Sequence, residues 1–369
     1  MSIAIASILS PLESLAPLAY QEHYDNAGLL TGDRNRDCSG VLTTLDITPE
    51  VVEEAIKKRC NLIVAHHPVI FGGLKRITGE NAVERTVIAA IRHDIAVYSI
   101  HTNLDNVLQG VNGRIADRLG LQKTGRIALA SGKGNLQKLY CFVPAGQSEQ
   151  VRNAIFAAGG GEIGNYSECS FQTEGAGTFR GGEGTHPFVG QPGIRHVEKE
   201  LKIEVILPAH RSGAVVAAMI AAHPYEEPAY DLVELVNRHP ETGSGLIGQL
   251  PEPLEETVFL EKVKNAFRTS VIRHSALTGR PVRSCAVCGG AGSFLISNAL
   301  SAKVDFFITA DLKYHEFFQA DGRLVLADIG HFESEQFTTD LLYEILREKF
   351  PNFAVLKSDT KTNPVNYYS

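Results

Sequence analysis

Apolar runs of strand length alternate with amphipathic segments of helical spacing over most of this chain. Strand-like runs bounded by turn residues cover 40–46, 62–65, 95–100, 284–287, 305–309, 323–329 and 353–356. Helical spacing covers 9–20, 49–60, 81–93, 110–119 and a segment ending at 349, and a glycine-rich turn at 289–293 is predicted to open a further helix to 302. Strands and helices that alternate at these lengths predict βαβ units. We therefore expect an α/β fold with mostly parallel or mixed sheets and flanking helices.

The middle of the chain follows a different pattern, which contains an internal repeat. Val143–Ser148 and Leu207–Ser212 share the motif (Val/Leu)-Pro-Ala-x-x-Ser, and each is followed by a helical segment of matching spacing and then by a candidate strand, at 169–172 and 230–235. Two βαβ copies of this size predict an inserted α+β domain of the ferredoxin-like class. The glycine- and proline-rich stretch 175–193 between them is predicted to be a long exposed loop. We expect the insert at 133–240, between α/β halves at 1–132 and 241–369.

Polar side chains gather where the predicted strands end. His66 and His67 close one strand, His101 and Asp105 follow the next, and His331-x-x-x-Glu335 follows the strand at 323–329. In an open α/β sheet ligands bind at this carboxyl edge. Because successive strand side chains point to opposite faces, His66 and His67 are expected not to hold one ion together. They could hold different ions, or one could orient the other, or both could form a turn that bonds only to the backbone.

With His101 left aside, these loops offer three imidazoles and two carboxylates. His331 and Glu335 are one helical turn apart, which suits a divalent cation with one nitrogen and one oxygen ligand. The set is too small for two closed four-ligand sites, but it fits two neighbouring ions with open positions for water or substrate. Asp105 is the expected bridge, because a carboxylate can divide its two oxygens between ions. His101 and His315 are the candidate proton donors, with the alternatives that they orient ligands or are structural.

The remaining motifs give weaker predictions. Gly289–Ser293 precedes a predicted helix but lacks the lysine and serine of a P-loop, so tight packing is favoured over phosphate binding. Cys285-x-x-Cys288 has no second pair, which argues against zinc or redox chemistry. His223–Glu227 is expected to form a turn or a subunit contact. Asp25-Asn26 could reach the metal cleft or only build a turn.

Composition limits the classes of partner. Among 369 residues the hydrophobic fraction is 44%, the charged fraction is 21%, and the net charge is −7. This acidic balance does not favour a nucleic-acid partner. No signal-like or membrane-spanning segment is apparent, and the six cysteines do not form a disulfide framework. A reducing cytoplasm is the expected location.

With these residues in view, the sequence resembles the NIF3-like family, the GTP cyclohydrolase I type 2 homologues. The matching motifs are Tyr24-Asp25-Asn26-x-Gly28-Leu29, Ala65-His66-His67-Pro68, His101-Thr102-Asn103-Leu104-Asp105, Gly289-Gly290-x-Gly292 and Gly330-His331-x-x-x-Glu335. The resemblance implies a dinuclear metal centre with ligands on His66, His67, Asp105, His331 and Glu335. It also implies an insert like the PII/CutA-type domain and a toroidal homohexamer. The sequence has Tyr24 where relatives often carry tryptophan.

Two functions of different classes follow. The first is a metal-dependent hydrolase of a small nucleotide-like molecule; a GTP cyclohydrolase-like reaction would attack C8 of guanine and release formate. The second is a regulatory or scaffold protein in which metals stabilise the fold and the insert senses a ligand or docks a partner. Donor sets of His, Asp and Glu accept zinc, manganese or iron, so the residues do not select among these metals.

Overall fold

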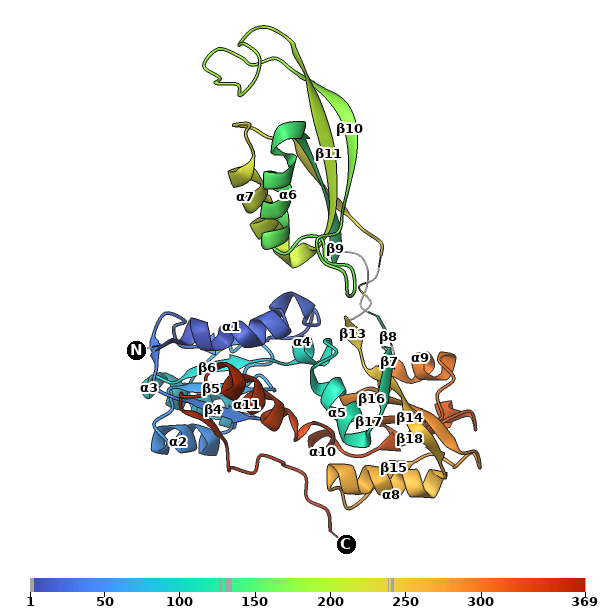
Figure 1. Cartoon of the computed structure of the whole chain (residues 1–369). Coiled ribbons are helices and arrows are strands. Elements are labelled where there is room, and N and C mark those ends of the chain that lie inside the picture. The colour runs from blue at the N-terminus through green and yellow to red at the C-terminus, as the bar shows by residue number, and fades with distance from the viewer. Residues whose placement is uncertain (1–2, 126–127, 130–134, 238, 240–241, 369) are drawn as a thin grey trace. The chain divides into compact units, whose positions relative to one another are not determined.

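The computed structural model describes residues 3–125, 128–129, 135–237, 239 and 242–368. The chain divides into two compact units (Figure 1). The larger consists of Met1–Leu129 and Glu241–Ser369, and the smaller of Ala130–Pro240. The fold is mixed α/β, with several sheets and flanking helices. Among the described residues no helix is both long and apolar enough to cross a bilayer.

The first sheet of the larger unit has five strands in the order β19-β4-β5-β6-β2. Only β2 runs antiparallel to its neighbour. Alternate residues of β5 enter opposite cores, with Leu62 and Val64 on the α1 and α11 side and Ile63 and Ala65 on the α2 and α3 side, so helices cover both faces. The elements are α1 (Ile5–Leu15), β2 (Gly28–Thr31), β4 (Val41–Thr44), α2 (Pro49–Lys57), β5 (Leu62–Ala65), α3 (Ala82–Arg92), β6 (Ala96–Ser99), α11 (Thr338–Lys349) and β19 (Val355–Lys357).

The second sheet has six strands in the order β15-β18-β17-β16-β14-β7. The strands β16, β17 and β18 are parallel, and the other three pair antiparallel. One face packs against α5 and α8, and the other against α9. The elements are α5 (Val111–Leu119), β7 (Gln122–Gly125), β14 (Leu246–Leu254), α8 (Glu256–Phe267), β15 (Arg273–His274), β16 (Val282–Ala291), η4 (Ser293–Leu295), α9 (Ile296–Ser301), β17 (Phe306–Ala310) and β18 (Val325–Asp328).

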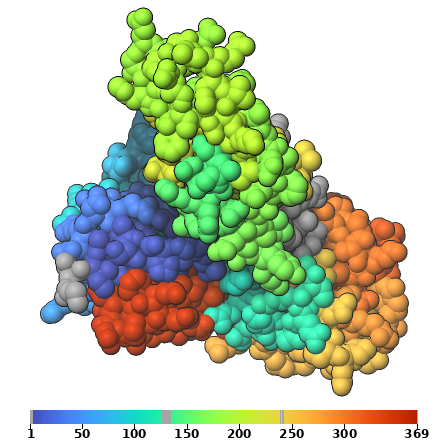
Figure 2. Space-filling model, turned by 45° about the horizontal axis from the view of Figure 1, so that its top comes forward, coloured from blue at the N-terminus to red at the C-terminus, as the bar shows by residue number. Residues whose placement is uncertain are grey.

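Short elements connect these sheets and complete the larger unit. Two of them, α4 (Thr102–Asp105) and α10 (His331–Glu335), carry residues of the site described below, and η5 (Tyr314–Ala320) lies between β17 and β18 in the chain. The others are β1 (Ile3–Ala4), η1 (Leu18–Tyr20), β3 (Asp37–Cys38), β8 (Ala128–Leu129) and β13 (Gly243–Ser244). Figure 2 shows the start of the chain in blue directly beside its end in red, where α1 packs on α11. The two halves of the sequence therefore form one body.

The smaller unit is a four-stranded antiparallel sheet of order β10-β11-β9-β12. Its own apolar core lies between the sheet and the helices α6 and α7. The elements are β9 (Leu136–Pro144), η2 (Ala145–Gln147), α6 (Ser148–Ala157), β10 (Ser170–Phe179), β11 (His196–Pro208), η3 (Ala209–Arg211), α7 (Ser212–Ala222) and β12 (Tyr230–Glu234). The segment His223–Glu227 forms a turn, in which the His223 ring bonds to the Phe142 carbonyl and the Tyr225 amide.

Two sequence predictions about glycine-rich stretches were wrong in part. Residues 180–193 form no helix or strand and none of them is buried, so this part of the predicted loop at 175–193 is confirmed. The stretch 175–179 is not loop but the second half of β10, where Gly177 faces Glu200 so closely that a β-carbon would meet its carboxylate. Likewise Gly289–Ala291 do not open a helix but extend β16, and helix α9 begins only at Ile296. In both places glycine allows close packing beside a strand rather than ending one.

The segment after β19 is fixed to the larger unit through Glu54 of α2. Its carboxylate accepts hydrogen bonds from the Ser358 hydroxyl at 2.5 Å, the Asp359 amide at 2.8 Å and the Thr360 hydroxyl at 2.6 Å. Further along, Thr362 donates to Asp46 at 2.5 Å. The end of the chain therefore runs from α2 toward the carboxyl edge of the first sheet.

Because of this anchor, we expect the segment after residue 357 to detach from α2 at low pH. Burial alone would raise the pKa of Glu54, but these hydrogen bonds and Lys58 lower it from 4.5 to about 2. The stabilisation is complete above about pH 4.5 and is lost as the pH falls toward 2. Glu54→Gln should cost about 1–2 kcal/mol and speed cleavage after residue 357 at neutral pH. Limited proteolysis measures this, with Glu53→Gln, an exposed neighbour, as control; equal cleavage of both variants would contradict the prediction.

Candidate metal centre

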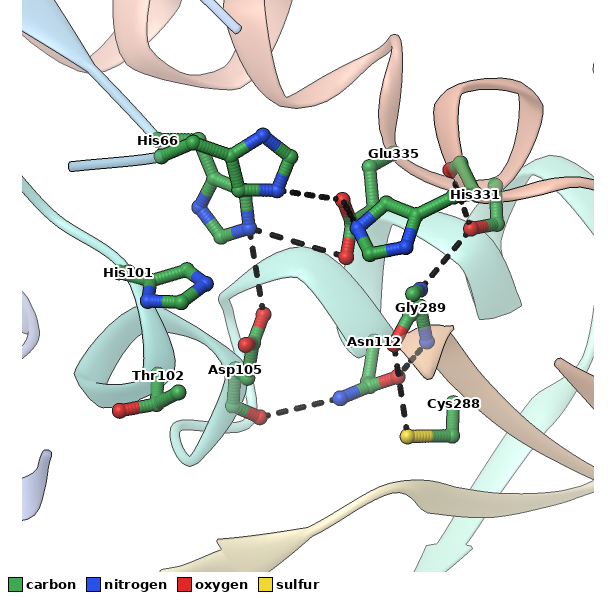
Figure 3. Close-up of polar contacts among 12 residues, drawn as sticks. His66, His101, Thr102, Asp105, Asn112, Cys288, Gly289, His331 and Glu335 are labelled. Atoms are coloured by element: carbon green, nitrogen blue, oxygen red, sulfur yellow. Dashed lines mark hydrogen bonds and ion pairs between the residues drawn. The ribbon is translucent and has the colours of Figure 1, made fainter. Parts of the chain in front are cut away.

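The predicted ligands converge at the carboxyl ends of the strands. His66 and His67 directly follow β5, Asp105 ends α4 after β6, and His331 and Glu335 begin and end α10 after β18. Figure 3 shows side chains from these segments turned toward one another. Three groups of three side chains place their ligand atoms within 4.8 Å of one another and could hold a metal ion: His66, His67 and His101; His67, His331 and Glu335; and His66, Asp105 and Glu335.

Glu335 lies at the centre of the cluster. Its Oε2 is 3.0 Å from Nε2 of His67 and 3.1 Å from Nε2 of His331, and its Oε1 is 3.8 Å from Nε2 of His66. The residue is 3% exposed and belongs to two of the three groups. Glu335 is therefore common to two of the groups that could hold an ion, and the bridging role predicted for Asp105 stays a prediction.

The two adjacent histidines both face the cluster, which corrects the expectation drawn from strand geometry. Their ring centroids are 4.8 Å apart, and both belong to one group that could hold an ion. Strand β5 ends at Ala65, so His66 and His67 lie in a bend where side chains no longer alternate. The alternation rule applies only while the backbone stays extended.

Each of the four imidazoles in the cluster is anchored through Nδ1. Three bond to a carboxylate at 2.7 Å, and His66 bonds to a backbone carbonyl at 2.9 Å. When Nδ1 carries the proton, Nε2 offers a lone pair toward the centre; such carboxylate–histidine pairs accompany metal-bound histidines. The pairs are His66 with the Ile100 carbonyl, His67 with Asp46, His101 with Asp25, and His331 with Asp311.

A buried nitrogen supports the fit to a cation. Nε2 of His66 is buried and has no hydrogen-bond partner, and Oδ1 of Asp105 lies 3.8 Å from it. A buried polar atom without a partner is costly. A cation next to this nitrogen would give it a partner. The donor set of imidazoles and carboxylates suits divalent transition metals.

Without a cation the cluster retains protons. Burial lowers the pKa of His67 and His331, but hydrogen bonds to Glu335 and to Asp46 or Asp311 outweigh it and raise these pKa values to about 10 and about 9. Burial and the charge of Glu335 raise the pKa of Asp105 to about 7. A bound cation would replace these protons, because metal ligands bind deprotonated.

The two candidate proton donors have different surroundings. His101 is part of the cluster, and its Nδ1 bonds to Asp25, whose other oxygen accepts from the Thr102 amide at 3.0 Å. Burial would raise the pKa of Asp25, but the hydrogen bonds from His101 and Thr102 lower it to about 2, so Asp25 stays charged and fixes the ring. His315 lies exposed in η5 against the rings of Tyr314 and Phe318, outside the cavity lining described below. Its predicted role in catalysis stays a prediction.

The glycine-rich end of β16 packs directly against the ligands. A β-carbon on Gly290 would lie 2.5 Å from Oε1 of Glu335 and 3.1 Å from the His331 ring. The Gly290 amide donates to Ser334, and the Gly289 amide donates to Asn112, whose side chain also bonds the Asp105 carbonyl. These amides are engaged within the protein, and the prediction of tight packing is confirmed.

The cluster lies in a cavity of about 750 Å³. This volume is in the range of small-molecule sites. Within the larger unit the lining draws on the turn at 22–24, the carboxyl edges of both sheets and the tail at 363–367. The arrangement therefore combines a candidate metal centre with space for a substrate.

The carboxylates that orient the ligands were not identified from the sequence. Asp46 ends the predicted strand at 40–46 and Asp311 follows the predicted strand at 305–309, but nothing in their spacing pointed to His67 and His331. The usable signal was position, since each comes just after a strand that ends at the cluster. Asp25, considered for the cleft or for a turn, reaches the cleft through His101.

Asp311→Asn should weaken metal binding about tenfold, the lower end of the loss for such partners. The substitution removes the charge facing Nδ1 of His331 yet suits the backbone, because Asp311 has a φ of 56°, a conformation that asparagine tolerates. Metal titration with a competing chelator measures the change. Asp321→Asn, at a φ of 48° in an exposed turn, is the matched control. Equal affinities for the two variants would contradict the orienting role.

Comparison with known proteins places this chain. The family description Duf34/NIF3 (NGG1p interacting factor 3) matches residues 3–364. Curated proteins named GTP cyclohydrolase 1 type 2 homolog are 39% identical in Halalkalibacterium halodurans, covering 98% of both chains, and 35% identical in Bacillus subtilis, covering 98% and 97%. A solved Bacillus cereus structure, described as related to NIF3, is 37% identical, covers 100% of both chains and has a TM-score of 0.88. The chain belongs to the Duf34/NIF3 family.

Proposed function

We propose that this protein is a metal-dependent hydrolase of a small nucleotide-like molecule, with two divalent cations in the cluster. The observation that supports this most is the convergence of four anchored imidazoles, Asp105 and Glu335, all of which line one cavity except the buried His66. His66, His67, Asp105, His331 and Glu335 would hold the ions. Divalent cations here would make water acidic enough to react near neutral pH and stabilise negative charge on the substrate.

The chain supplies the proton transfer. With Nδ1 held by Asp25, the His101 ring presents Nε2 to the cluster, where it can take a proton from water and return it to a leaving nitrogen. Asp25 stabilises the charged ring when the proton is held. For a guanine ring, water would add at C8, the ring would open, and hydrolysis would release formate.

The test is formate release. Metal-loaded protein is incubated with GTP and, separately, with guanosine, and formate is measured enzymatically. Release from either compound that disappears in Asp105→Ala supports the proposal. No release from either, or equal release by Asp105→Ala, overturns it.

The alternative is a regulatory or scaffold protein, and assembly distinguishes the two. All described residues that line the cavity belong to the larger unit, which leaves the smaller unit available for a separate role. Its element order β9-α6-β10-β11-α7-β12 supports our proposal that it is ferredoxin-like. We also propose a toroidal homohexamer. A hydrolase should keep its mass by light scattering in Asp105→Ala, whereas a metal-stabilised scaffold should dissociate.

A further inference from the structure

Large apolar side chains are exposed around the cavity above the candidate metal centre. Six of them line it, and each is between 46% and 61% exposed: Tyr24, Phe71, Val271, Phe294, Val365 and Tyr367. Exposed apolar groups that gather in one cavity next to a polar cluster are typical of a ligand site. The part of the cavity lined by these side chains is therefore suited to an apolar or aromatic ligand group.

A row of rings leads from the rim of the cavity to the cluster. The Tyr24 and Phe71 rings have centroids 6.4 Å apart, and the Phe71 and His101 rings are 6.1 Å apart. His101 itself lies 5.2 Å from the His66 ring. A planar ring stacked on Phe71 would therefore present its edge to His101 and the metal ligands.

The charge of the lining opposes a polyphosphate. Among the described lining residues there are seven carboxylates and one guanidinium, Arg273. Arg273 is already engaged, since it donates to Asp328 at 3.0 Å and to the Leu312 carbonyl at 2.9 Å. Two divalent cations would reduce the negative excess without removing it. The carboxylates are Glu22, Asp46, Asp105, Asp311, Asp328, Glu333 and Glu335.

From these observations we infer that the cavity takes a purine ring at the level of the nucleoside or base and discriminates against the triphosphate. The inference rests on the proposed function for its choice of a nucleotide-like ring. Apolar walls and stacking rings bind the heterocycle, and the carboxylates repel a chain of phosphates. The expected ligands are thus purine nucleosides and bases, and a nucleoside triphosphate such as GTP is expected to bind more weakly.

Direct binding tests this. Full-length zinc-loaded protein is titrated with guanosine and with GTP, the latter as its magnesium complex so that it does not remove zinc. Guanosine should bind at least tenfold more tightly. Equal or tighter binding of magnesium GTP, or no binding of guanosine, overturns the inference.

Two variants separate the aromatic from the electrostatic part. Phe71→Ala should weaken guanosine binding roughly fivefold or more, as loss of a stacking ring does. Phe318→Ala, at another exposed phenylalanine that lies outside the lining, should not. Glu22→Gln should tighten magnesium GTP and leave guanosine unchanged. If Phe71→Ala and Phe318→Ala have the same effect, or Glu22→Gln does not favour GTP, the inference is wrong.

These results are independent of turnover. Selective guanosine binding without formate release would refute the hydrolase and leave the selectivity standing. Formate release together with preferred binding of GTP would support the hydrolase and refute the selectivity for the nucleoside.

Discussion

Glu335→Gln is expected to reduce bound metal from the two ions per subunit that we propose to fewer than one. The substitution removes the buried charge that is common to two of the three side-chain groups that could hold a metal ion. It leaves the new amide 3.0–3.1 Å from Nε2 of His67 and His331. The affinity should fall by more than the roughly 10–100-fold that loss of an orienting partner costs. Elemental analysis after dialysis against a limiting metal concentration measures the occupancy, and thermal unfolding with and without metal measures the linked stability.

A second glutamate on the same short helix gives the control. Glu333 is 8% exposed and accepts a hydrogen bond from Asn363. Among the described residues it belongs to none of the side-chain groups that could hold a metal ion. Glu333→Gln should therefore keep both ions. The expected order of metal loss is Glu335→Gln, then Asp311→Asn, then Glu333→Gln. Two ions retained by Glu335→Gln would remove the basis of the metal centre.

The carboxyl-edge rule explains only part of the convergence. His66 and Asp105 follow β5 and β6, which are parallel neighbours in one sheet and end at a common edge. His331 follows β18 of the other sheet, so the rule places it at a carboxyl edge but does not predict that the edges of the two sheets meet. What the rule could not supply was side-chain direction. His66 and His67 share a group because β5 ends at Ala65, so neither histidine belongs to the strand that both were predicted to close. The end of a strand is poorly determined by an apolar run.

The strands missed from the sequence are those without a clear apolar period. Strand β14 contains Pro251 and Pro253, and its pairing with β16 shifts between Gln249 and Leu254. Its neighbour β7, an edge strand, is almost entirely exposed and polar. Antiparallel strands that add to a parallel core depend on tertiary pairing, which leaves a weak signal in the sequence. The glycines gave a misleading signal instead of a weak one. Gly289 and Gly290 indicated a turn, but they lie in β16 and allow it to pack closely against its neighbours.

Gly290→Ala is expected to disrupt the metal centre without touching a ligand. Gly290 has a φ of 61°, and the added methyl would lie 2.5 Å from Oε1 of Glu335 and 3.1 Å from Nε2 of His331. Either carboxylate and imidazole move apart or the strand shifts, and both displace ligand atoms from the positions that converge on an ion. Metal affinity should fall more than tenfold, comparable to the loss of an orienting partner, and the metal-dependent part of the thermal stability should disappear.

Backbone strain alone would not produce this result, and Gly279 allows the two effects to be separated. Gly279 has a φ of 71°, and a β-carbon there would meet no atom within 4 Å. Gly279→Ala should therefore cost about 1–2 kcal/mol of strain and keep its metal, whereas Gly290→Ala adds the steric conflict with Glu335. Calorimetry of the two metal-free variants measures the loss of stability that backbone strain causes in both. Metal titration measures the difference in metal affinity between them. Because the methyl group brings no charge and removes no donor, metal loss confined to Gly290→Ala would show that ligand placement, and not only ligand identity, determines binding. Equal metal affinity in both variants would mean that the end of β16 does not fix the position of Glu335.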